Sequence, residues 1–161
     1  QATEVVNGFD AGVIITNEDI PHDKIKKPVT VLKPQTIAVG IGSRKIVSED
    51  DIVELVSGAL KQVNIPLERV DHLATVEIKK DSPSMLNAAK KIGLNLEFIS
   101  IDRLGAFKHE DLSADSKVVK QKIGVGGVCE QAALIVAGKK AKLILKKMKA
   151  KGVTVAVAQG E

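Results

Sequence analysis

Residues 37–45 read IAVGIGSRK, and this stretch decides the fold. The segment 36–42 is apolar and rich in β-branched residues, which predicts a strand buried on both faces. A helix is predicted directly after it, because Ser48 and Asp51 have the spacing of a capping box and apolar residues then recur at helical spacing. A buried strand followed at once by a helix is typical of an α/β domain.

The strand and helix cycle repeats further along the chain. Residues 70–78 predict a second strand, and Ser82 followed by Pro83 predicts the start of a helix that ends at Gly93. Residues 96–100 predict a third strand. Strands that alternate with helices favour a largely parallel sheet.

The last third of the chain adds a buried helix and a hairpin. Short helical turns are expected at 103–107 and 118–123, and a helix at 128–137 that is apolar nearly all round. Residues 141–148 and 153–158 predict a closing β-hairpin. The expected fold is therefore a layered α/β/α domain, with a mostly parallel sheet and a C-terminal β-hairpin.

The first 34 residues do not follow this cycle. They contain two short candidate strands, 13–16 and 29–32, which is too little for a separate core. Since the chain starts with Gln1, we interpret 1–34 as a remnant of a preceding middle region with a linker, and 35–161 as the domain.

Composition excludes several classes of site. The longest apolar run, 132–137, is far shorter than the roughly 18 residues that a membrane-spanning helix needs. Cys129 is the only cysteine and the three histidines are scattered, which argues against a disulfide and a cysteine-rich metal site. We expect a cytoplasmic protein with no membrane partner, no metal site and no cofactor of its own.

The net charge of +4 suggests nucleic acid as a partner, but the pattern favours another explanation. Lysines crowd residues 139–151 within the predicted hairpin, and lysines protect an exposed strand edge from pairing with other chains. Tyr and Trp are absent, so stacking platforms for bases are few. Nucleic acid binding through this lysine stretch remains a minor alternative.

Three interpretations of the glycine stretch are open. Gly40 and Gly42 match the first two glycines of a dinucleotide fingerprint, but Lys45 stands at the third position. The glycines could also form a structural turn. The third interpretation is an anion-binding corner, in which Ser43, Arg44 and Lys45 lie at the edge where α/β proteins place ligands, before a helix N-terminus.

Two further segments carry candidate site residues. Thr75, Glu77 and Lys79 end the second strand and would reach the same edge on alternating sides, unless they are only surface charge. Gly126 and Gly127 precede the helix whose first turn contains Glu130. That carboxylate either complements the helix dipole or, if partly buried, serves as a general base, while its neighbour Cys129 suits packing better than nucleophilic attack.

Four segments in this order resemble the CbiG family. They are Val39-Gly40-Ile41-Gly42-Ser43-Arg44, Leu73-Ala74-Thr75-Val76-Glu77-Ile78-Lys79, the run from Gly124 to Leu134 (GVGGVCEQAAL), and Val153-Thr154-Val155-Ala156-Val157-Ala158. The resemblance is to the C-terminal domain of CbiG, which is also found alone as CobE. The opening segments GVIIT and VLKP are similar to the middle region of CbiG.

The resemblance implies cobalamin biosynthesis and cobalt-precorrin-5A hydrolase activity: a lactone on the macrocycle is opened and acetaldehyde is released. The cobalt would belong to the substrate, an anionic corrinoid. Its carboxylates suit Arg44, Lys45 and Lys79. The implied partners are the N-terminal domain of the same protein and other enzymes of the pathway.

The chain departs from the family pattern at three positions. Ser43 stands where a cysteine is common, Glu77 replaces the usual aspartate, and Ser82 replaces an acidic residue before the proline. The resulting hypothesis has Glu130 or Glu77 activate water while Arg44 or Lys79 stabilises the oxyanion. The competing hypothesis is a module that binds the corrinoid while the chemistry occurs elsewhere.

Overall fold

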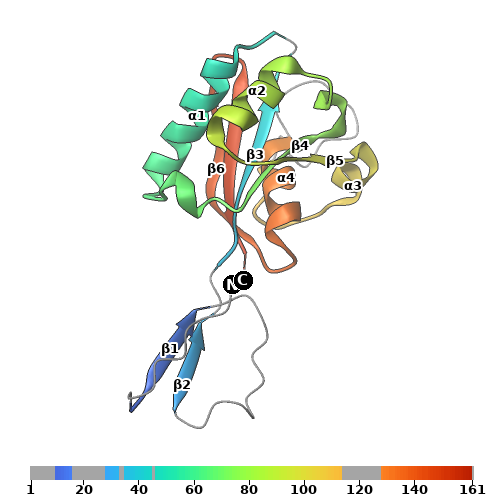
Figure 1. Cartoon of the computed structure of the whole chain (residues 1–161). Helices are drawn as coiled ribbons and strands as arrows, with labels where there is room; N and C mark the ends of the chain where they lie inside the picture. Colours follow the sequence, from blue (N-terminus) through green and yellow to red (C-terminus); the bar gives the residue numbers. More distant parts are fainter. Residues whose placement is uncertain (1–9, 16–27, 33–34, 45, 114–127, 161) are drawn as a thin grey trace. The chain divides into compact units, whose positions relative to one another are not determined.

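The structure, a computed structural model, describes residues 10–15, 28–32, 35–44, 46–113 and 128–160. The chain divides into two compact units, Gln1–Gln35 and Thr36–Glu161, which are considered separately (Figure 1). In the first unit, β1 (Gly12–Ile15) pairs in parallel with β2 (Val29–Leu32). Both strands therefore form close to where the sequence predicts them.

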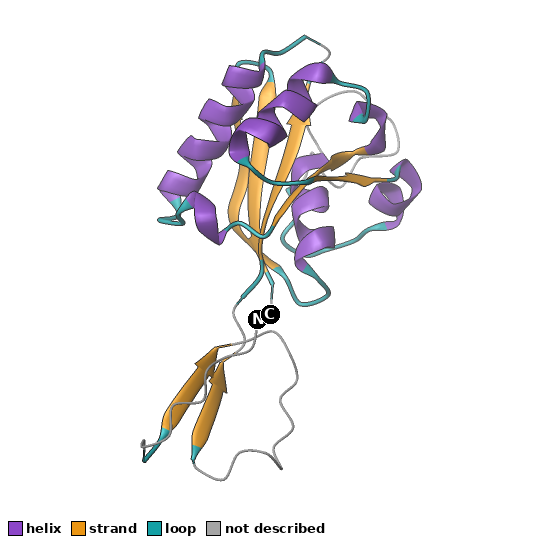
Figure 2. Cartoon of the chain, viewed as in Figure 1, coloured by secondary structure: helices purple, strands orange, loops and turns teal. Residues whose placement is uncertain are grey.

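The second unit is built on a five-stranded sheet of described residues in the order β5-β4-β3-β7-β6 (Figure 2). Its strands are β3 (Ile37–Ser43), β4 (His72–Val76), β5 (Leu96–Ile99), β6 (Lys142–Ala150) and β7 (Val153–Gln159). The strands β3, β4 and β5 are parallel, while β7 is antiparallel to both of its neighbours, β3 and β6. The α/β class, the parallel strands and the closing hairpin are confirmed.

Helices cover both faces of this sheet. One face carries α1 (Glu49–Gln62) and α2 (Pro83–Ile92), which contact each other, and the other carries α4 (Val128–Ala137), which lies against β3, β4 and β7 (Figure 1). The short elements are η2 (Leu67–Arg69), η3 (Glu77–Lys79) and α3 (Ile101–Ala106). The sandwiched position of α4 explains its apolar sequence, because nearly all of its residues are buried.

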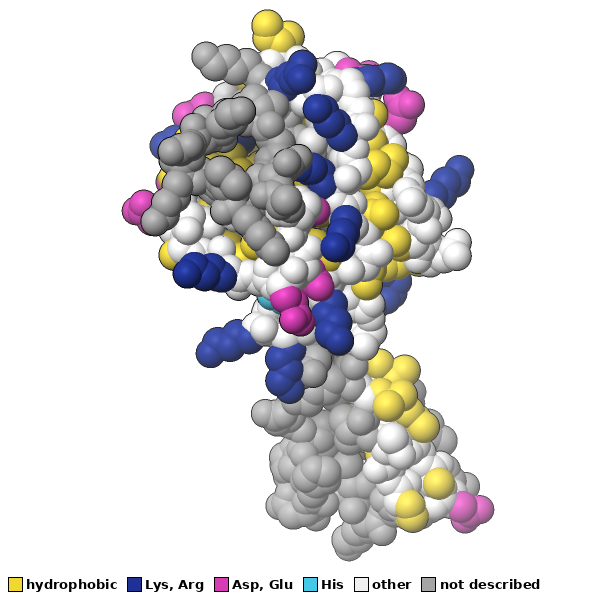
Figure 3. Space-filling model, turned by 180° about the vertical axis from the view of Figure 1, so that it is seen from behind, with side chains coloured by type: hydrophobic (Ala, Val, Ile, Leu, Met, Phe, Trp, Pro, Cys, Tyr) yellow, Lys and Arg dark blue, Asp and Glu magenta, His cyan; other side chains and the backbone are white. Residues whose placement is uncertain are grey.

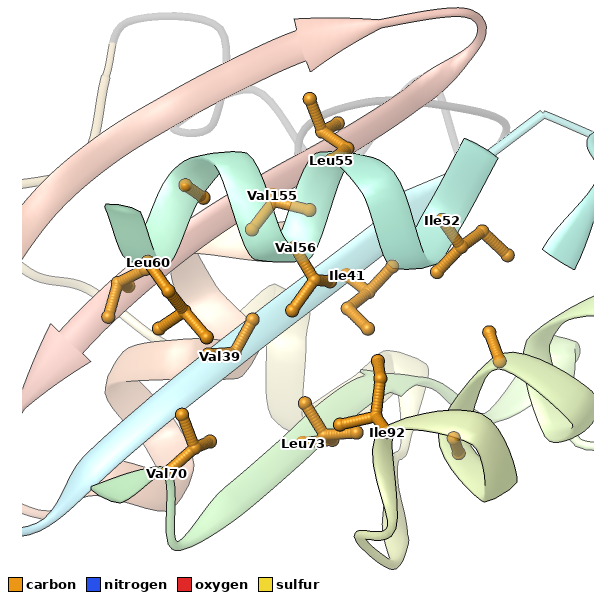
Figure 4. Close-up of a cluster of buried hydrophobic side chains, with 14 of the residues drawn as sticks. Val39, Ile41, Ile52, Leu55, Val56, Leu60, Val70, Leu73, Ile92 and Val155 are labelled. Carbon is orange, nitrogen blue, oxygen red and sulfur yellow. The ribbon is translucent and has the colours of Figure 1, made fainter. Parts of the chain in front are cut away.

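The largest apolar cluster fills the space between the sheet and the first two helices. Alternate residues of β3 and β7 point into it, together with one stripe of α1 and one of α2 (Figure 4). Ser48 fixes the start of α1, since its Oγ accepts a hydrogen bond from Asp51 N at 3.0 Å. Gly93 ends α2 in the left-handed conformation, with φ of 82°.

The strand β3 continues through both glycines, so the expectation of a glycine turn is wrong. The glycines are needed for close packing on the α4 side of the sheet. A Cβ on Gly40 would lie 1.9 Å from Cys129 O, and one on Gly42 would lie 2.6 Å from Thr154 Oγ1. Both positions therefore bring other chain segments closer to β3 than any side chain would allow.

The second predicted strand is shorter than expected. It ends at Val76, and Glu77–Lys79 forms the 3₁₀ turn η3 instead of extending the sheet. The alternation expected for Thr75, Glu77 and Lys79 is consequently lost after Thr75. The helical turn predicted at 118–123 lies outside the described residues.

The strand β6 is the outer strand next to β7, as the lysine pattern predicts for a solvated edge. Its pairing with β7 shifts register between Leu143 and Leu145 and again between Leu145 and Met148. Figure 3 shows Lys and Arg side chains spaced along this side of the unit, with hydrophobic side chains beside them. Bulges and lysines together make this edge a poor template for another strand.

Candidate functional site at the carboxyl ends of β3 and β4

The carboxyl ends of β3 and β4 bring several of the predicted site residues together. Lys79 Nζ donates a hydrogen bond to Arg44 O at 3.1 Å, although the two residues lie on different loops. Arg44 N donates to Gly152 O at 2.9 Å, which ties the same loop to the β6–β7 turn. Two of the three basic residues predicted from the sequence, Arg44 and Lys79, therefore lie at one edge of the sheet and are called the basic pair below.

Two hydroxyl groups lie just below this edge. Thr75 is buried and its Oγ1 donates to Ile41 O at 2.7 Å, linking the ends of β3 and β4. Ser43 is only 4% exposed, and its Oγ has no hydrogen-bond partner among the described residues. A buried hydroxyl without a partner is costly, and the role of Ser43 in ligand binding stays a prediction.

The N-terminus of α1 does not provide the free anion site that the sequence suggests. Its first turn contains Glu49, Asp50 and Asp51, and Lys91 from α2 forms ion pairs with the first two of these. The hydrogen bond from Lys91 lowers the pKa of Glu49, and the one from Ser48 lowers the pKa of Asp51. These carboxylates repel a further anion, so the binding role predicted for Arg44 and Lys79 gains no support from this helix start.

Glu77 is directed toward another helix start. Its Oε1 accepts a hydrogen bond from Ile101 N at 3.0 Å, at the first residue of α3. A carboxylate at this position satisfies one of the free amide groups that begin a helix. The geometry thus gives Glu77 a capping contact, and its catalytic role stays a prediction.

Glu130 is fully buried and its carboxylate is hydrogen-bonded on both oxygens. Oε2 accepts from Ser113 N and from Ser113 Oγ, each at 2.9 Å, and Oε1 accepts from Lys147 N at 2.9 Å. Lys147 lies in the second register shift of β6, where the bulge interrupts the pairing with β7. Glu130 therefore joins α4 to the irregular edge strand.

Asp111 makes a second link of the same kind, which the sequence analysis missed. Its Oδ2 accepts a hydrogen bond from Leu143 N at 3.0 Å, at the other irregular point of β6. No sequence pattern marks Asp111, because its partner is a backbone amide 32 residues away. Two carboxylates thus satisfy amide groups at both irregular points of β6.

The carboxylate of Glu130 does not lie at the same edge of the sheet as Arg44 and Lys79, so the prediction that the three residues meet there is wrong. Lys147 lies between the partners of Val157 and Val155, level with Ala156, which pairs with Gly40. Arg44 follows Gly40 by four residues, roughly 13 Å along a strand at about 3.3 Å per residue. The carboxylate of Glu130 is bound at mid-sheet, on the α4 side.

Three predicted site residues, Lys45, Gly126 and Gly127, lie outside the described residues. Cys129 is within them and is fully buried in the first turn of α4. Burial raises the pKa of its thiol to about 11, so the reactive thiolate is scarce at neutral pH. This environment agrees with the packing role preferred from the sequence.

Apolar side chains at the same edge are a feature that the sequence analysis did not single out. Ile46 follows the end of β3 and is 95% exposed, and Ile78 lies in η3 and is 51% exposed. Their signal in the sequence was an isoleucine directly after Lys45 and another directly before Lys79. The edge therefore combines positive charge with exposed apolar surface.

Other features of the described residues lie away from this edge or lack the required chemistry. No group of three or more His, Cys, Asp or Glu side chains in the described part is arranged to hold a metal ion. None of the described helices has both the length and the apolar character to cross a membrane. An open hollow at the opposite end of the sheet is lined by Ile37, Val63, Asn64, Ile65, Pro66, Arg69, Ile144 and Gln159.

Comparison with known proteins supports the resemblance found in the sequence. The family described as "Cobalamin synthesis G C-terminus" matches residues 37–158. A "Probable cobalt-precorrin-5A hydrolase" of Methanocaldococcus jannaschii is 34% identical over 160 residues, which cover 95% of this chain and 48% of that protein. The chain therefore spans about half the length of this relative.

Two further relatives differ in their extent. A "Cobalt-precorrin-5A hydrolase" of Priestia megaterium is 27% identical over 150 residues, covering 92% of this chain and 39% of that protein. "Protein CobE" of a Sinorhizobium species is 26% identical over 122 residues, covering 76% of this chain and 79% of that protein. The matching region thus occurs both inside longer proteins and as most of a short one.

Solved structures agree with this fold. The cobalamin biosynthesis protein chiG of Agrobacterium tumefaciens has a TM-score of 0.62 and 33% identity, over 78% of this chain and 99% of that chain. A putative cobalamin biosynthesis protein G homolog of Sulfolobus solfataricus has a TM-score of 0.65 and 26% identity, over 94% of this chain and 51% of that chain. The second match extends over most of the first unit's residues as well.

Proposed function

The chain belongs to the cobalamin synthesis G C-terminus family, and on that basis we propose that it contributes to cobalt-precorrin-5A hydrolysis by binding the anionic corrinoid substrate. The observation that carries the proposal is the contact between Lys79 Nζ and Arg44 O, which places two cationic residues at one edge of the sheet. The names of the longer relatives support the hydrolase reaction.

The chemistry of the substrate fits this edge. A corrinoid intermediate has acetate and propionate arms around its ring, and a guanidinium group binds a carboxylate through two parallel hydrogen bonds. The ammonium group of Lys79 adds a compact charge beside it. The unpartnered hydroxyl of Ser43 supplies a neutral donor. The cobalt enters with the substrate, so the chain needs no cofactor for this role.

The proposed reaction begins with attack of water on the lactone carbonyl. Arg44 or Lys79 stabilises the developing oxyanion, and the freed alcohol then collapses in a retro-aldol step that releases acetaldehyde. Glu77, at this edge, is the remaining candidate for the general base, whereas the carboxylate of Glu130 is bound at mid-sheet, away from it. Each already accepts a backbone hydrogen bond, which favours positioning of the site over proton transfer.

The partners follow from the same proposal. Because the chain spans less than half of the M. jannaschii relative, we assign the missing catalytic groups to a further domain of the same protein, the N-terminal domain of CbiG. Other enzymes of the cobalamin pathway are the next candidates. We place the reaction in the cytoplasm, with no membrane or nucleic acid involved.

A second candidate function is a corrinoid-binding module that performs no chemistry. The match to CobE favours it, because CobE corresponds to this region without the longer chain of the hydrolase relatives. In that case the same edge would bind corrinoid, while another protein would carry out ring opening. The two functions share the binding step and differ in turnover.

The test incubates this chain with cobalt-precorrin-5A and measures both binding and acetaldehyde. We expect binding by the wild type that weakens about tenfold in Arg44→Ala and in Lys79→Ala, through loss of a charge-assisted contact. Lys61→Ala is the matched control, since Lys61 is an exposed lysine at the far end of α1.

The outcomes separate the two functions. Acetaldehyde release by this chain supports the hydrolase, whereas binding without release supports the module. Equal affinity of Arg44→Ala, Lys79→Ala and the wild type would remove the edge from the proposal.

A further inference from the structure

We propose that Ile46 and Ile78 form an apolar contact for the face of the corrinoid ring, between the cationic residues that bind its carboxylates. The inference rests on the proposed function, because it assigns a second set of contacts to the same edge. It adds a recognition element that charge cannot provide, namely selection of a macrocycle over small polycarboxylates.

The positions of the two side chains support this assignment. Ile46 lies two residues after Arg44, and Ile78 directly precedes Lys79. Since Lys79 Nζ is bonded to Arg44 O, the loops that carry the isoleucines are joined at this point. Each isoleucine therefore accompanies one member of the basic pair.

Nothing in the described part of the chain gives a structural reason for the exposure of these side chains. Ile46 is 95% exposed and precedes α1, so it does not belong to the buried stripe of that helix. Ile78 is 51% exposed in η3, a turn without any buried residue. Exposed apolar side chains on loops that also carry cationic residues are typical of a binding surface.

Exposed isoleucine side chains together with cationic residues favour one class of ligand. A corrin ring is an extended, largely apolar face with carboxylate arms around its perimeter, so it can cover apolar side chains and meet cations at the same time. A small polycarboxylate can satisfy Arg44 and Lys79 but covers little apolar surface. Contact with the ring would remove isoleucine surface from water, which favours the macrocycle.

The experiment compares two anions on the full chain by calorimetry. Cobyrinic acid supplies a corrin ring with carboxylates, and benzenehexacarboxylate supplies carboxylates without a corrin ring. We expect Ile46→Ser and Ile78→Ser each to weaken cobyrinic acid binding about 5- to 10-fold. The affinity for benzenehexacarboxylate should stay within about twofold of the wild type, because the cationic residues are unchanged.

Two sets of variants serve as controls. Ile46→Val and Ile78→Leu keep an apolar side chain and should keep most of the affinity for cobyrinic acid. Arg44→Ala should weaken both anions, because it removes a shared contact. Urea unfolding midpoints equal to that of the wild type would establish that the serine variants fold normally.

The outcomes distinguish this inference from the function on which it rests. If the wild type binds neither anion, the proposed corrinoid-binding function is overturned. If it binds cobyrinic acid and the serine variants bind it equally well, only the role of the isoleucines is overturned. An equal loss of affinity for both anions in the serine variants would also overturn the role of the isoleucines, because they would then act only by shaping the loop.

Discussion

The sheet surface beneath α4 and the carboxyl edge of β3 both include residues of the stretch 37–46, but they differ in burial and in charge. Beneath α4, Gly40 lies against the backbone of the helix, whose own residues Cys129 and Glu130 are fully buried. At the edge, Arg44 is exposed and Ile46 is almost fully exposed. One region is closed and hydrogen-bonded internally, while the other is open.

The difference shows why the glycine motif is a poor guide to a phosphate site. In β3 the two glycines allow a helix backbone and a threonine side chain to approach the strand. Ser43, directly after them, is still buried, and the charged, solvent-exposed part of the stretch begins at Arg44. The first part of the stretch, up to Gly42, therefore serves packing, and the part from Arg44 onward forms the candidate binding edge.

The largest expected effect is that of Gly40→Ala. The new Cβ would lie 1.9 Å from Cys129 O and 2.7 Å from Ala133 N, and backbone atoms cannot move as a flexible side chain can. We expect the free energy of unfolding to fall by about 3 kcal/mol, measured by urea denaturation. Gly105→Ala is the control, because nothing lies within 4 Å of its added Cβ, and it should change stability by less than about 1 kcal/mol.

The next effect is that of Glu130→Gln. An amide NH₂ replaces one carboxylate oxygen and meets a hydrogen-bond donor, either Ser113 or Lys147 N. We expect a loss of about 2–3 kcal/mol in unfolding free energy and faster hydrogen exchange at the Lys147 amide. Glu110→Gln, at an exposed position, should change neither quantity.

Glu130→Gln also bears on catalysis. Normal stability together with loss of acetaldehyde release in the longer enzyme would contradict the structural role and restore Glu130 as a general base. If the Glu130→Gln variant is less stable but its folded fraction still releases acetaldehyde, Glu130 has a structural role in the region beneath α4.

The alkylation rate of a cysteine thiol can be measured in both regions and compared directly. Because burial raises the pKa of Cys129 to about 11, its thiolate fraction at pH 8 is about 100-fold below that of an unfolded thiol. We expect alkylation by iodoacetamide to be slower in the folded protein by at least this factor. A cysteine introduced by Ile46→Cys should react at nearly the rate of an unfolded thiol. Slow alkylation at both position 46 and Cys129 would contradict the claim that the edge is open and the region beneath α4 is closed.

The smallest effect concerns the acidic first turn of α1. Hydrogen bonds from Lys91 and Ser48 lower the pKa values of Glu49 and Asp51, so their contribution to stability is present above the ordinary carboxyl range. It is lost as the pH falls through the lowered values. Lys91→Ala should therefore reduce the decrease in urea midpoint between pH 7 and pH 3, and added salt should have a similar effect.

Local signals predicted most of the elements. The buried run of β3, the cap at Ser48 and the glycine after α2 each depend on neighbouring residues, and the structure confirms all three. The boundary of β4 was misjudged, because residues 77–79 continue the apolar and polar alternation yet form a turn. Alternation alone does not report where the sheet pairing ends.

The sequence by itself determined the order of strands and helices, the basic residues of the candidate site and the lysine-rich outer strand, because these follow from composition and short-range periodicity. It also indicated the family, through the resemblance of four segments. Only the tertiary structure decided the partners of the carboxylates and the use of the glycines. Glu130 bonds to Lys147 N, 17 residues away, and Gly40 lies against a helix that begins at Val128. Contacts of this kind depend on which chain segments meet in space, and no local pattern in the sequence records them.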